Sequence, residues 1–453
     1  MPITRKMPVP AGSDPVPRNS PPVTAALERL LRVIEEVFPV PGRFRSSLPR
    51  DVAELSRLLT GGRSERENGY LSRPNLLSAY LRYFLPWNVF RLHRLFSLVS
   101  DGTAPSGHGL DNPKGGPDGL FGLSEPFRLD NGAALTDIGS GPLTFPIALW
   151  LFRPELRKRD LEFRCVDHSA PALEAGKKLL AALAPEGETA WKIRIIRDSV
   201  NAPVRGKKAG LVTAINVFNE VYRRGDPAFA ADKAAKLLER LCSDEGSIIV
   251  MEPGIPESGA FIAALRDALR EREKRIAAPC THEGPCPLPG IYGGLFRDEA
   301  GRVPSPPGAS PSTGRGKAKW CHFAFDTAEA PAELHRLSAA AGIPKERAVF
   351  SFLAAGKALP GGVAGIRVIS DAFPVSGGWG RYACGLAGHG AAAGHGADDR
   401  IAANDGEIVG ATKNLILIRG TKDTIERITP GTVVESGKQA GLDKKTRALI
   451  VEL

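Results

Sequence analysis

The stretch that decides the fold is Leu135-Thr136-Asp137-Ile138-Gly139-Ser140-Gly141, where a short apolar run turns into a helical pattern. Glycines at such a turn let the backbone bend tightly and approach a ligand beside the positive end of the following helix. Further apolar runs alternate with helical segments along the chain, from LEFRCVD at 161–167 to GSIIVMEP at 246–253. This alternation predicts an α/β fold with a doubly wound parallel sheet.

Polar side chains stand where the predicted strands end. Asp167 closes the second strand, Asp198 follows the third and Asn216 follows the fourth. In folds of this kind the acid after the second strand accepts ribose hydroxyls. A dinucleotide-binding loop would carry a third glycine, but Thr144 stands in its place and Asp137 precedes the first glycine. The residues therefore indicate a nucleotide-type site, and the alternative is a doubly wound domain that keeps only the shape of the loop.

The pattern Asp137-x-Gly-x-Gly, followed by Asp167 and Asp198, resembles the class I S-adenosylmethionine-dependent methyltransferases. The resemblance implies that Gly139, Ser140 and Gly141 pack against the methionine end of the cofactor, with Asp137 near its amino group. It also implies that Asp167 binds the ribose hydroxyls and Asp198 the adenine amine. We add Asn216 to this cofactor-binding set.

The sequence of the turn after the fourth strand identifies no catalytic residue. It lacks the Asn-Pro-Pro-aromatic sequence of amino-group methyltransferases and carries Asn216, Asn219 and Glu220 instead. No general base stands out. The sequence therefore leaves both a methyltransferase and a non-catalytic cofactor-binding protein open.

The chain contains six cysteines, and the N-terminus has no apolar segment of the secretory kind, which argues against a disulfide framework. Cys165 and Cys242 lie in apolar runs and are expected to be buried small hydrophobes. The other four lie among Gly, Pro and His: Cys280, Cys286, Cys321 and Cys384. Four thiolates suit a tetrahedral metal or a cubic cluster, but their spacing matches no paired zinc knuckle. Unliganded surface thiols are the rival interpretation.

Five motifs share one further resemblance: Asp137-Ile-Gly-Ser-Gly-Pro, Asn219-Glu220, Met251-Glu-Pro-Gly, Ala278-Pro-Cys-Thr-His-Glu-Gly-Pro-Cys-Pro and Trp320-Cys-His-Phe. Together they resemble the methyltransferase-like small-ribosomal-subunit assembly family, known from mitochondria with bacterial and archaeal relatives. The resemblance implies a [4Fe-4S] cluster on Cys280, Cys286, Cys321 and Cys384. It also implies a small β domain after the methyltransferase domain, and binding to the small ribosomal subunit and its rRNA. A small-molecule methyltransferase with a structural zinc site is the alternative.

The N-terminal part is the most basic, because residues 1–100 hold 15 Lys and Arg against 8 Asp and Glu. Its arginines alternate with aromatic residues: Arg82, Tyr83, Trp87, Phe90, Arg91, Arg94 and Phe96. Such a pattern can grip phosphates and stack on unpaired bases. The equally weighted alternative is that the aromatics are buried against the sheet while the arginines are solvated.

Composition and the positions of Gly- and Pro-rich segments predict how the chain divides into domains. The net charge of +10 suits a polyanionic partner, and no apolar stretch is long enough to span a membrane. We expect a cytoplasmic protein without a membrane partner that is monomeric when free. The expected parts are a disordered leader (1–22), a basic helical domain (23–100), a linker (101–119), the class I methyltransferase domain (120–278), a cysteine segment with a flexible insertion (279–346) and a β-rich C-terminal domain (347–453).

Overall fold

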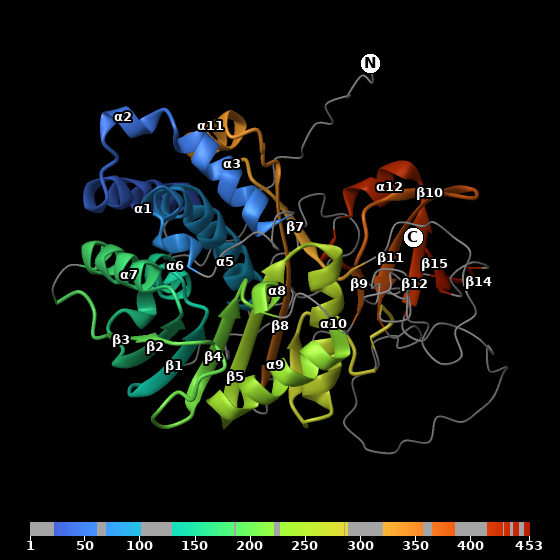
Figure 1. Cartoon of the computed structure of the whole chain (residues 1–453). Helices are drawn as coiled ribbons and strands as arrows, with labels where there is room; N and C mark the ends of the chain where they lie inside the picture. The colour runs from blue at the N-terminus through green and yellow to red at the C-terminus, as the bar shows by residue number, and fades with distance from the viewer. Residues whose placement is uncertain are drawn as a thin grey trace, which may run out of the picture.

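The computed structural model describes residues 22–60, 69–100, 129–184, 187–221, 227–284, 286–288, 320–356, 365–385, 415–428, 430–434, 438–443 and 448–453. Figure 1 shows a larger sheet flanked by helices and a smaller sheet toward the C-terminus. Three expected features lie outside the described residues: the leader apart from Pro22, the linker over 101–119 and the flexible insertion over 302–316.

The larger sheet has eight strands within the described residues. They are β1 (Ala133–Ile138), β2 (Leu161–Asp167), β3 (Lys192–Arg197), β4 (Ala209–Ile215), β5 (Cys242–Pro253), β6 (Arg275–Ala278), β7 (Phe323–Asp326) and β8 (Arg347–Gly356). Their order is β3-β2-β1-β4-β5-β8-β6, with β7 paired to β8. Strands β1 to β5 are parallel, and β8 runs antiparallel between β5 and β6. The order is that of a doubly wound sheet built mainly from parallel strands, so the predicted α/β fold class is confirmed.

Both faces of this sheet are covered by helices, as Figure 1 shows. The helices within and after the strand series are α6 (Thr144–Phe152), a short 3-10 turn (Pro154–Leu156), α7 (Ala170–Leu183), α8 (Phe218–Val221), α9 (Pro227–Leu241) and α10 (Pro256–Arg270). Side chains of β5 alternate between the faces because strand residues point in opposite directions in turn. Ile249 and Met251 enter the core that includes α6 and α7, whereas Ile248 and Val250 enter the core of α9 and α10.

The N-terminal helices share a core with the sheet. They are α1 (Val23–Val37), α2 (Gly42–Arg45), α3 (Leu48–Leu59), the 3-10 turn η2 (Tyr70–Ser72), α4 (Pro74–Ala79), the π-helical segment η3 (Tyr80–Phe84) and α5 (Leu85–Ser100). In α1, Leu27, Leu30 and Ile34 recur at helical spacing and are buried. One apolar cluster joins them to Trp87 of α5 and Phe163 of β2. The expectation of a separate helical domain is therefore wrong, because these helices bury their apolar faces on the methyltransferase sheet.

The smaller sheet has seven strands within the described residues. They are β9 (Ile366–Val368), β10 (Phe373–Val375), β11 (Gly378–Cys384), β12 (Leu415–Gly420), β13 (Val433–Val434), β14 (Lys438–Leu442) and β15 (Leu449–Glu452), with helix α12 (Lys422–Arg427). The order is β13-β9-β11-β12-β15-β14, with β10 on β11. The expected β-rich C-terminal unit is present as a mixed sheet with one short helix.

The expected domain boundary at residue 347 is wrong. Strand β8 begins at Arg347 and belongs to the larger sheet, because it pairs with β5, β6 and β7. Helix α11 (Ala332–Ala340) precedes it and lies against α3. None of the helices in the described part of the chain is both long enough and apolar enough to cross a membrane.

Candidate functional site

The glycine loop lies at the carboxyl end of β1, between β2 and β4. Gly139 and Gly141 have φ angles of 64° and 52°, a region that residues with a side chain rarely adopt. A Cβ on Gly139 would lie 2.4 Å from a methyl group of Val217, so the turn after β4 packs directly on the loop. The predicted strand-to-helix turn is therefore formed, and α6 begins at Thr144.

Asp137 is 2% exposed, and both of its carboxylate oxygens accept hydrogen bonds from the protein. The Ser140 hydroxyl donates to Oδ2 at 2.5 Å and the Thr213 hydroxyl donates to Oδ1 at 2.6 Å. Burial raises the pKa of Asp137 to about 6, against the opposing effect of these two bonds. Asp137 thus ties the loop to β1 and β4, and its role toward a cofactor amino group stays a prediction.

Asp167 stands beside the loop at the end of β2. The Gly141 N–H donates to its Oδ2 at 2.9 Å, and the Ser169 N–H donates to its Oδ1 at 2.8 Å. Ser169 also caps α7, since its hydroxyl accepts from the Ala172 N–H. The carboxylate is therefore fixed by backbone donors at the edge where a ribose was expected.

The remaining expected cofactor residues lie at the same edge of the sheet. Asp198 follows β3, is exposed, and accepts from the Ser199 N–H at 2.7 Å. Asn216 follows β4 with a φ of 57°, and its N–H donates to the Met251 carbonyl at 2.7 Å. The structure thus gathers these side chains around the loop, because the parallel strands end together.

Glu252, at the end of β5, shapes the turn after β4, which sequence reasoning did not foresee. Its Oε1 accepts from the N–H groups of Val217 at 3.1 Å and Phe218 at 2.8 Å, and its Oε2 accepts from the Asn219 N–H at 3.1 Å. Burial raises the pKa of Glu252 to about 8, although these three bonds act in the opposite direction. An acid at the end of an otherwise apolar strand was the available signal.

Tyr80 reaches the glycine loop from the N-terminal helices, which the sequence did not predict. A Cβ on Gly141 would lie 3.9 Å from the Tyr80 hydroxyl oxygen. Burial raises the pKa of this hydroxyl, and the negative charges of Glu220 and Asp167 act in the same direction. Tyr80 opens the π-helical segment η3, and such segments often occur at functional sites. Hydrophobic periodicity carries no signal for a π-helical turn.

The aromatic residues expected on an RNA-binding face are part of the core. Tyr83, Trp87 and Phe90 are at most 1% exposed. Arg82 and Arg94 are buried too, and they pair with acids: Arg82 with Glu35 at 3.0 Å and Arg94 with Glu329 at 2.8 Å. The structure favours the burial alternative for the aromatics, but it corrects the picture of solvated arginines.

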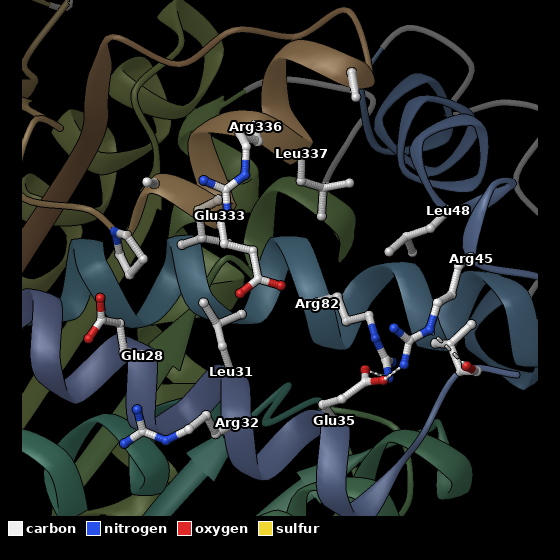
Figure 2. A pocket seen from close by; sticks show the side chains of 15 residues that line it. Glu28, Leu31, Arg32, Glu35, Arg45, Leu48, Arg82, Glu333, Arg336 and Leu337 are labelled. Carbon is white, nitrogen blue, oxygen red and sulfur yellow. Dashed lines mark hydrogen bonds and ion pairs between the residues drawn. The ribbon is translucent and has the colours of Figure 1, made fainter. Parts of the chain in front are cut away.

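A hollow of about 760 Å³ lies on the outer side of these helices, between α1, α2 and α11. Figure 2 shows Arg45 and Arg82 converging on Glu35 at one end of it. Glu28, Arg32, Glu333 and Arg336 also line it, so both signs of charge are present. None of its lining residues comes from the strands that carry the glycine loop.

The four cysteines of the second half converge, although they come from three separate segments. Cys280 follows β6, Cys321 precedes β7 and Cys384 ends β11. Cys321 and Cys384 share one apolar cluster, and Cys286 packs against it. Burial raises the pKa of Cys280, of Cys286 and, to about 11, of Cys384; charges on neighbouring cysteines act in the same direction. The expectation of unliganded surface thiols is therefore wrong for Cys280, Cys321 and Cys384, which are buried.

Two buried arginines contact these sulfurs. Arg266 of α10 donates from Nε to Cys280 Sγ at 3.0 Å. Arg367 of β9 donates from Nη2 to Cys321 Sγ at 3.0 Å and to Cys384 Sγ at 3.6 Å. Among the described residues, Arg367 has no carboxylate partner, and its Nε and Nη1 have no hydrogen-bond partner. A guanidinium buried in this way requires negative charge nearby.

As the side chains stand, no group of three or more His, Cys, Asp or Glu among the described residues is arranged to hold a metal ion. His322, next to Cys321, lies with Nδ1 3.0 Å from the Trp320 carbonyl oxygen. Cys165 and Cys242 are buried in the two cores of the larger sheet, as expected of small hydrophobes.

Comparisons with known proteins bear on part of the chain. Residues 131–291 match the family model described as mitochondrial small ribosomal subunit Rsm22. No curated protein matches the chain.

Solved structures with some similarity are methyltransferases. One is a putative methyltransferase from Thermoplasma acidophilum, 13% identical over 52% of this chain and 72% of its own, with a TM-score of 0.26. A second, from Geobacter sulfurreducens in complex with S-adenosyl-L-homocysteine, is 18% identical over 40% of this chain and 71% of its own, with a TM-score of 0.25. A third, from Clostridium acetobutylicum, is 16% identical over 27% of this chain, with a TM-score of 0.21, and the chain spans 43% of it. Residues 131–291 thus match the family model that the motifs predicted, and they carry β1 to β6 of the larger sheet.

Proposed function

We propose that this protein is an S-adenosylmethionine-binding, [4Fe-4S]-containing methyltransferase-like protein that acts on or with the rRNA of the small ribosomal subunit. The observation that carries the proposal is the coincidence of two findings in one segment. Residues 131–291 match a family named for the mitochondrial small ribosomal subunit, and the same residues form the glycine loop and the acidic strand ends of a class I methyltransferase fold.

Cofactor binding is supported by the chemistry of the strand ends. Asp167 is held by the Gly141 and Ser169 N–H groups, which orient its carboxylate toward the loop. S-adenosylmethionine carries a positive sulfonium and no phosphate, so an acidic surround suits it better than a dinucleotide. Glu220, Asp167 and Asp198 supply that surround. When bound, the cofactor supplies an activated methyl group; the residues of this chain hold and orient it.

The cluster proposal rests on the donor set and its charge. Cys280, Cys286, Cys321 and Cys384 would hold the group, and the buried guanidinium groups of Arg266 and Arg367 already contact three of the sulfurs. Neutral thiols would leave Arg367 without a counter-charge, whereas cluster thiolates supply one. In a cubic cluster each thiolate binds a different iron, so the sulfurs stand farther apart than around one ion.

The rRNA partner, a cytoplasmic location and a monomeric free state complete the proposal. The basic N-terminal part supports the polyanionic partner, because residues 1–100 carry a large excess of Lys and Arg. A small-molecule methyltransferase with structural zinc is the competing function, and it has no observation in its favour beyond the four cysteines.

Anaerobic purification tests the cluster and the partner together. We expect a brown protein with broad absorbance at about 400 nm and about four iron and four sulfide per chain. Small-subunit rRNA should co-sediment with it, and calorimetry should show S-adenosylmethionine binding. Cys321→Ser should lose the iron, with Cys165→Ser as the matched control that keeps it. One zinc per chain without sulfide would overturn the cluster, and an absence of both rRNA and cofactor binding would overturn the function.

A further inference from the structure

Arg91 of α5 is the one arginine of the expected RNA-binding pattern that has no acidic partner among the described residues. Arg82 and Arg94 pair with Glu35 and Glu329, as described above. The Arg91 Nη1 donates to Asn88 Oδ1 at 2.7 Å, while its Nε is buried and has no hydrogen-bond partner among the described residues. The side chain as a whole keeps some exposed surface. Such an arginine is poised to bind an anion from outside the chain.

The surroundings of Arg91 are positive and aromatic. Lys345 lies nearby with its Nζ 5.7 Å from the ring centroid of Tyr83 and 5.4 Å from that of Trp87. Burial lowers the pKa of Lys345 to about 7, and the charge of Arg91 acts in the same direction. Lys345 is therefore only partly charged near neutral pH, and Arg91 is the permanent cation of this region, with Asn88 and no carboxylate as its partner among the described residues.

Tyr80 is influenced both by this positive region and by the acidic strand ends. Its hydroxyl lies next to Gly141; burial raises its pKa, and the negative charges of Glu220 and Asp167 act in the same direction. The charge of Arg91 and a hydrogen bond with Asn88 act in the opposite direction. Its ring stacks on Phe84, with centroids 5.7 Å apart. Groups of both signs of charge therefore act on one hydroxyl.

A site that has carboxylates and a guanidinium around one hydroxyl suits a zwitterion. The methionine part of S-adenosylmethionine carries an ammonium group and a carboxylate on the same carbon. Asp137, Asp167 and Glu220 repel a carboxylate, and the carboxylate oxygens of Asp137 are already bonded within the protein. A planar guanidinium with a free donor, assisted by a phenol, is the usual partner for a carboxylate.

We infer that Arg91, with Tyr80 beside it, binds the carboxylate of the cofactor's methionine part, so that the N-terminal helices complete the cofactor site. This inference rests on the proposed cofactor. It explains why α4, η3 and α5 are built into the core of the methyltransferase unit: they bring a cation to an edge of the sheet that otherwise carries acids. Arg91 is therefore a binding residue in this scheme, and Asn88 is a positioning residue that holds its guanidinium.

The test compares two ligands that differ in one group. Calorimetry is run with S-adenosylmethionine and with its decarboxylated form, which keeps the amine, the sulfonium and the nucleoside. The wild-type protein should prefer the carboxylate-bearing ligand by about 10- to 100-fold, the range for a hydrogen bond to a charged group. Arg91→Gln should abolish most of that preference by weakening S-adenosylmethionine alone. Tyr80→Phe should reduce it by about 2- to 10-fold.

Arg32→Gln is the matched control, because Arg32 is an exposed arginine of α1 that lines the separate hollow. It should leave both affinities unchanged. If Arg91→Gln does not fold, Arg91→Lys is used instead. It keeps the positive charge but lacks the paired N–H donors of the guanidinium, and it should retain part of the preference. Equal weakening of both ligands, or of neither, would overturn the inference, as would a loss confined to rRNA binding, which would assign Arg91 to a phosphate. If the wild type binds neither ligand, the proposed function fails instead.

Discussion

The glycine-loop edge and the cysteine site treat buried charge in opposite ways. At the loop, the carboxylates of Asp137 and Asp167 are satisfied by hydroxyl and backbone donors of the chain itself. At the cysteine site, the hydrogen bonds of Arg367 within the described residues go to sulfur, and its guanidinium carbon lies 5.2 Å from the Phe323 ring centroid. The carboxylates of the loop thus have their hydrogen bonds without a ligand. At the cysteine site Arg266 has Asp267 as a partner at 2.6 Å, but Arg367 requires anionic sulfur to balance its charge. This difference predicts that removing a charge changes the free energy of unfolding more at the cysteine site than at the loop. It also predicts that the sign of the change depends on whether iron is bound.

The largest expected effect belongs to Arg367→Met, which replaces the guanidinium by an apolar side chain. In iron-loaded protein it should lower the free energy of unfolding by about 3–5 kcal/mol, because it leaves buried negative charge unpaired. After the iron is chelated, the thiols are neutral, and the same change should stabilise the protein by about 1–4 kcal/mol. Anaerobic thermal unfolding before and after chelation measures both values.

Arg381→Met is the matched control for this change of sign. Arg381 is also buried, at 5% exposed against 1% for Arg367, but it donates to the Ile425 and Ser370 carbonyls at 2.8 Å and not to sulfur. Its substitution should destabilise both forms alike. If Arg367→Met also had the same effect in both forms, the sulfurs would carry no charge and the contrast between the two sites would disappear.

At the loop, the ionisation of Asp137 should change the free energy of unfolding by roughly 3 kcal/mol between about pH 4 and 6. Burial raises its pKa from an ordinary 3.8 to about 6 in the folded protein. Between those values the folded state holds a proton that the unfolded state has lost, so this carboxyl lowers the free energy of unfolding as pH rises from about 4 to 6. Asp137→Asn should remove that decline, seen by urea unfolding across this range. Asp198→Asn, at an exposed site, should keep the wild-type slope; a persistent slope in Asp137→Asn would contradict the assignment.

The strand ends of the first sheet were predictable from sequence because each parallel strand contains several apolar residues and a polar residue stands at or just after its end. Asp167 and Asn216 could therefore be assigned to one edge without coordinates. Strand β8 has the same kind of pattern, yet it was assigned to the later domain. Its place between β5 and β6 depends on pairing with residues about 75–110 positions earlier, which local periodicity cannot encode.

Side chains whose role depends on distant partners were the ones that sequence reasoning missed or misplaced. Trp87 and Phe90 have the composition of an RNA-stacking surface, but helix packing buries them. Arg367 gave no signal at all, because its importance arises only when Cys321 and Cys384 meet in space. Deleting residues 1–100 to test RNA binding would remove part of the core, so surface substitutions are needed instead.

A smaller effect is expected at the cofactor edge from Asp167→Ala. If the carboxylate binds the ribose, the change should weaken S-adenosylmethionine by about 1.5–3 kcal/mol, measured by calorimetry. Asp198→Ala removes an exposed carboxylate from the same edge and should cost less, because solvent competes for its hydrogen bonds. Equal melting temperatures would show that the loop still folds. Unchanged affinity in Asp167→Ala would remove this residue from the site and leave the loop without a ligand role.

The smallest expected effect concerns the RNA surface. Because the aromatic residues of α5 are buried, an exposed aromatic residue is the candidate for stacking on RNA. Phe44 of α2 is 51% exposed, and the guanidinium carbon of Arg43 lies 4.8 Å from its ring centroid. Arginine beside an exposed ring can stack on an unpaired base and neutralise a phosphate. Phe44→Ala should weaken binding to small-subunit rRNA by about 1 kcal/mol, or about fivefold, in fluorescence anisotropy at fixed salt. Phe229→Ala is the matched control, since Phe229 is 60% exposed with Lys233 over its ring, on α9 at a distance from α2 in Figure 1. An equal loss in both variants would indicate nonspecific attraction, and a loss only in Phe229→Ala would move the RNA to the helices on the other face of the sheet.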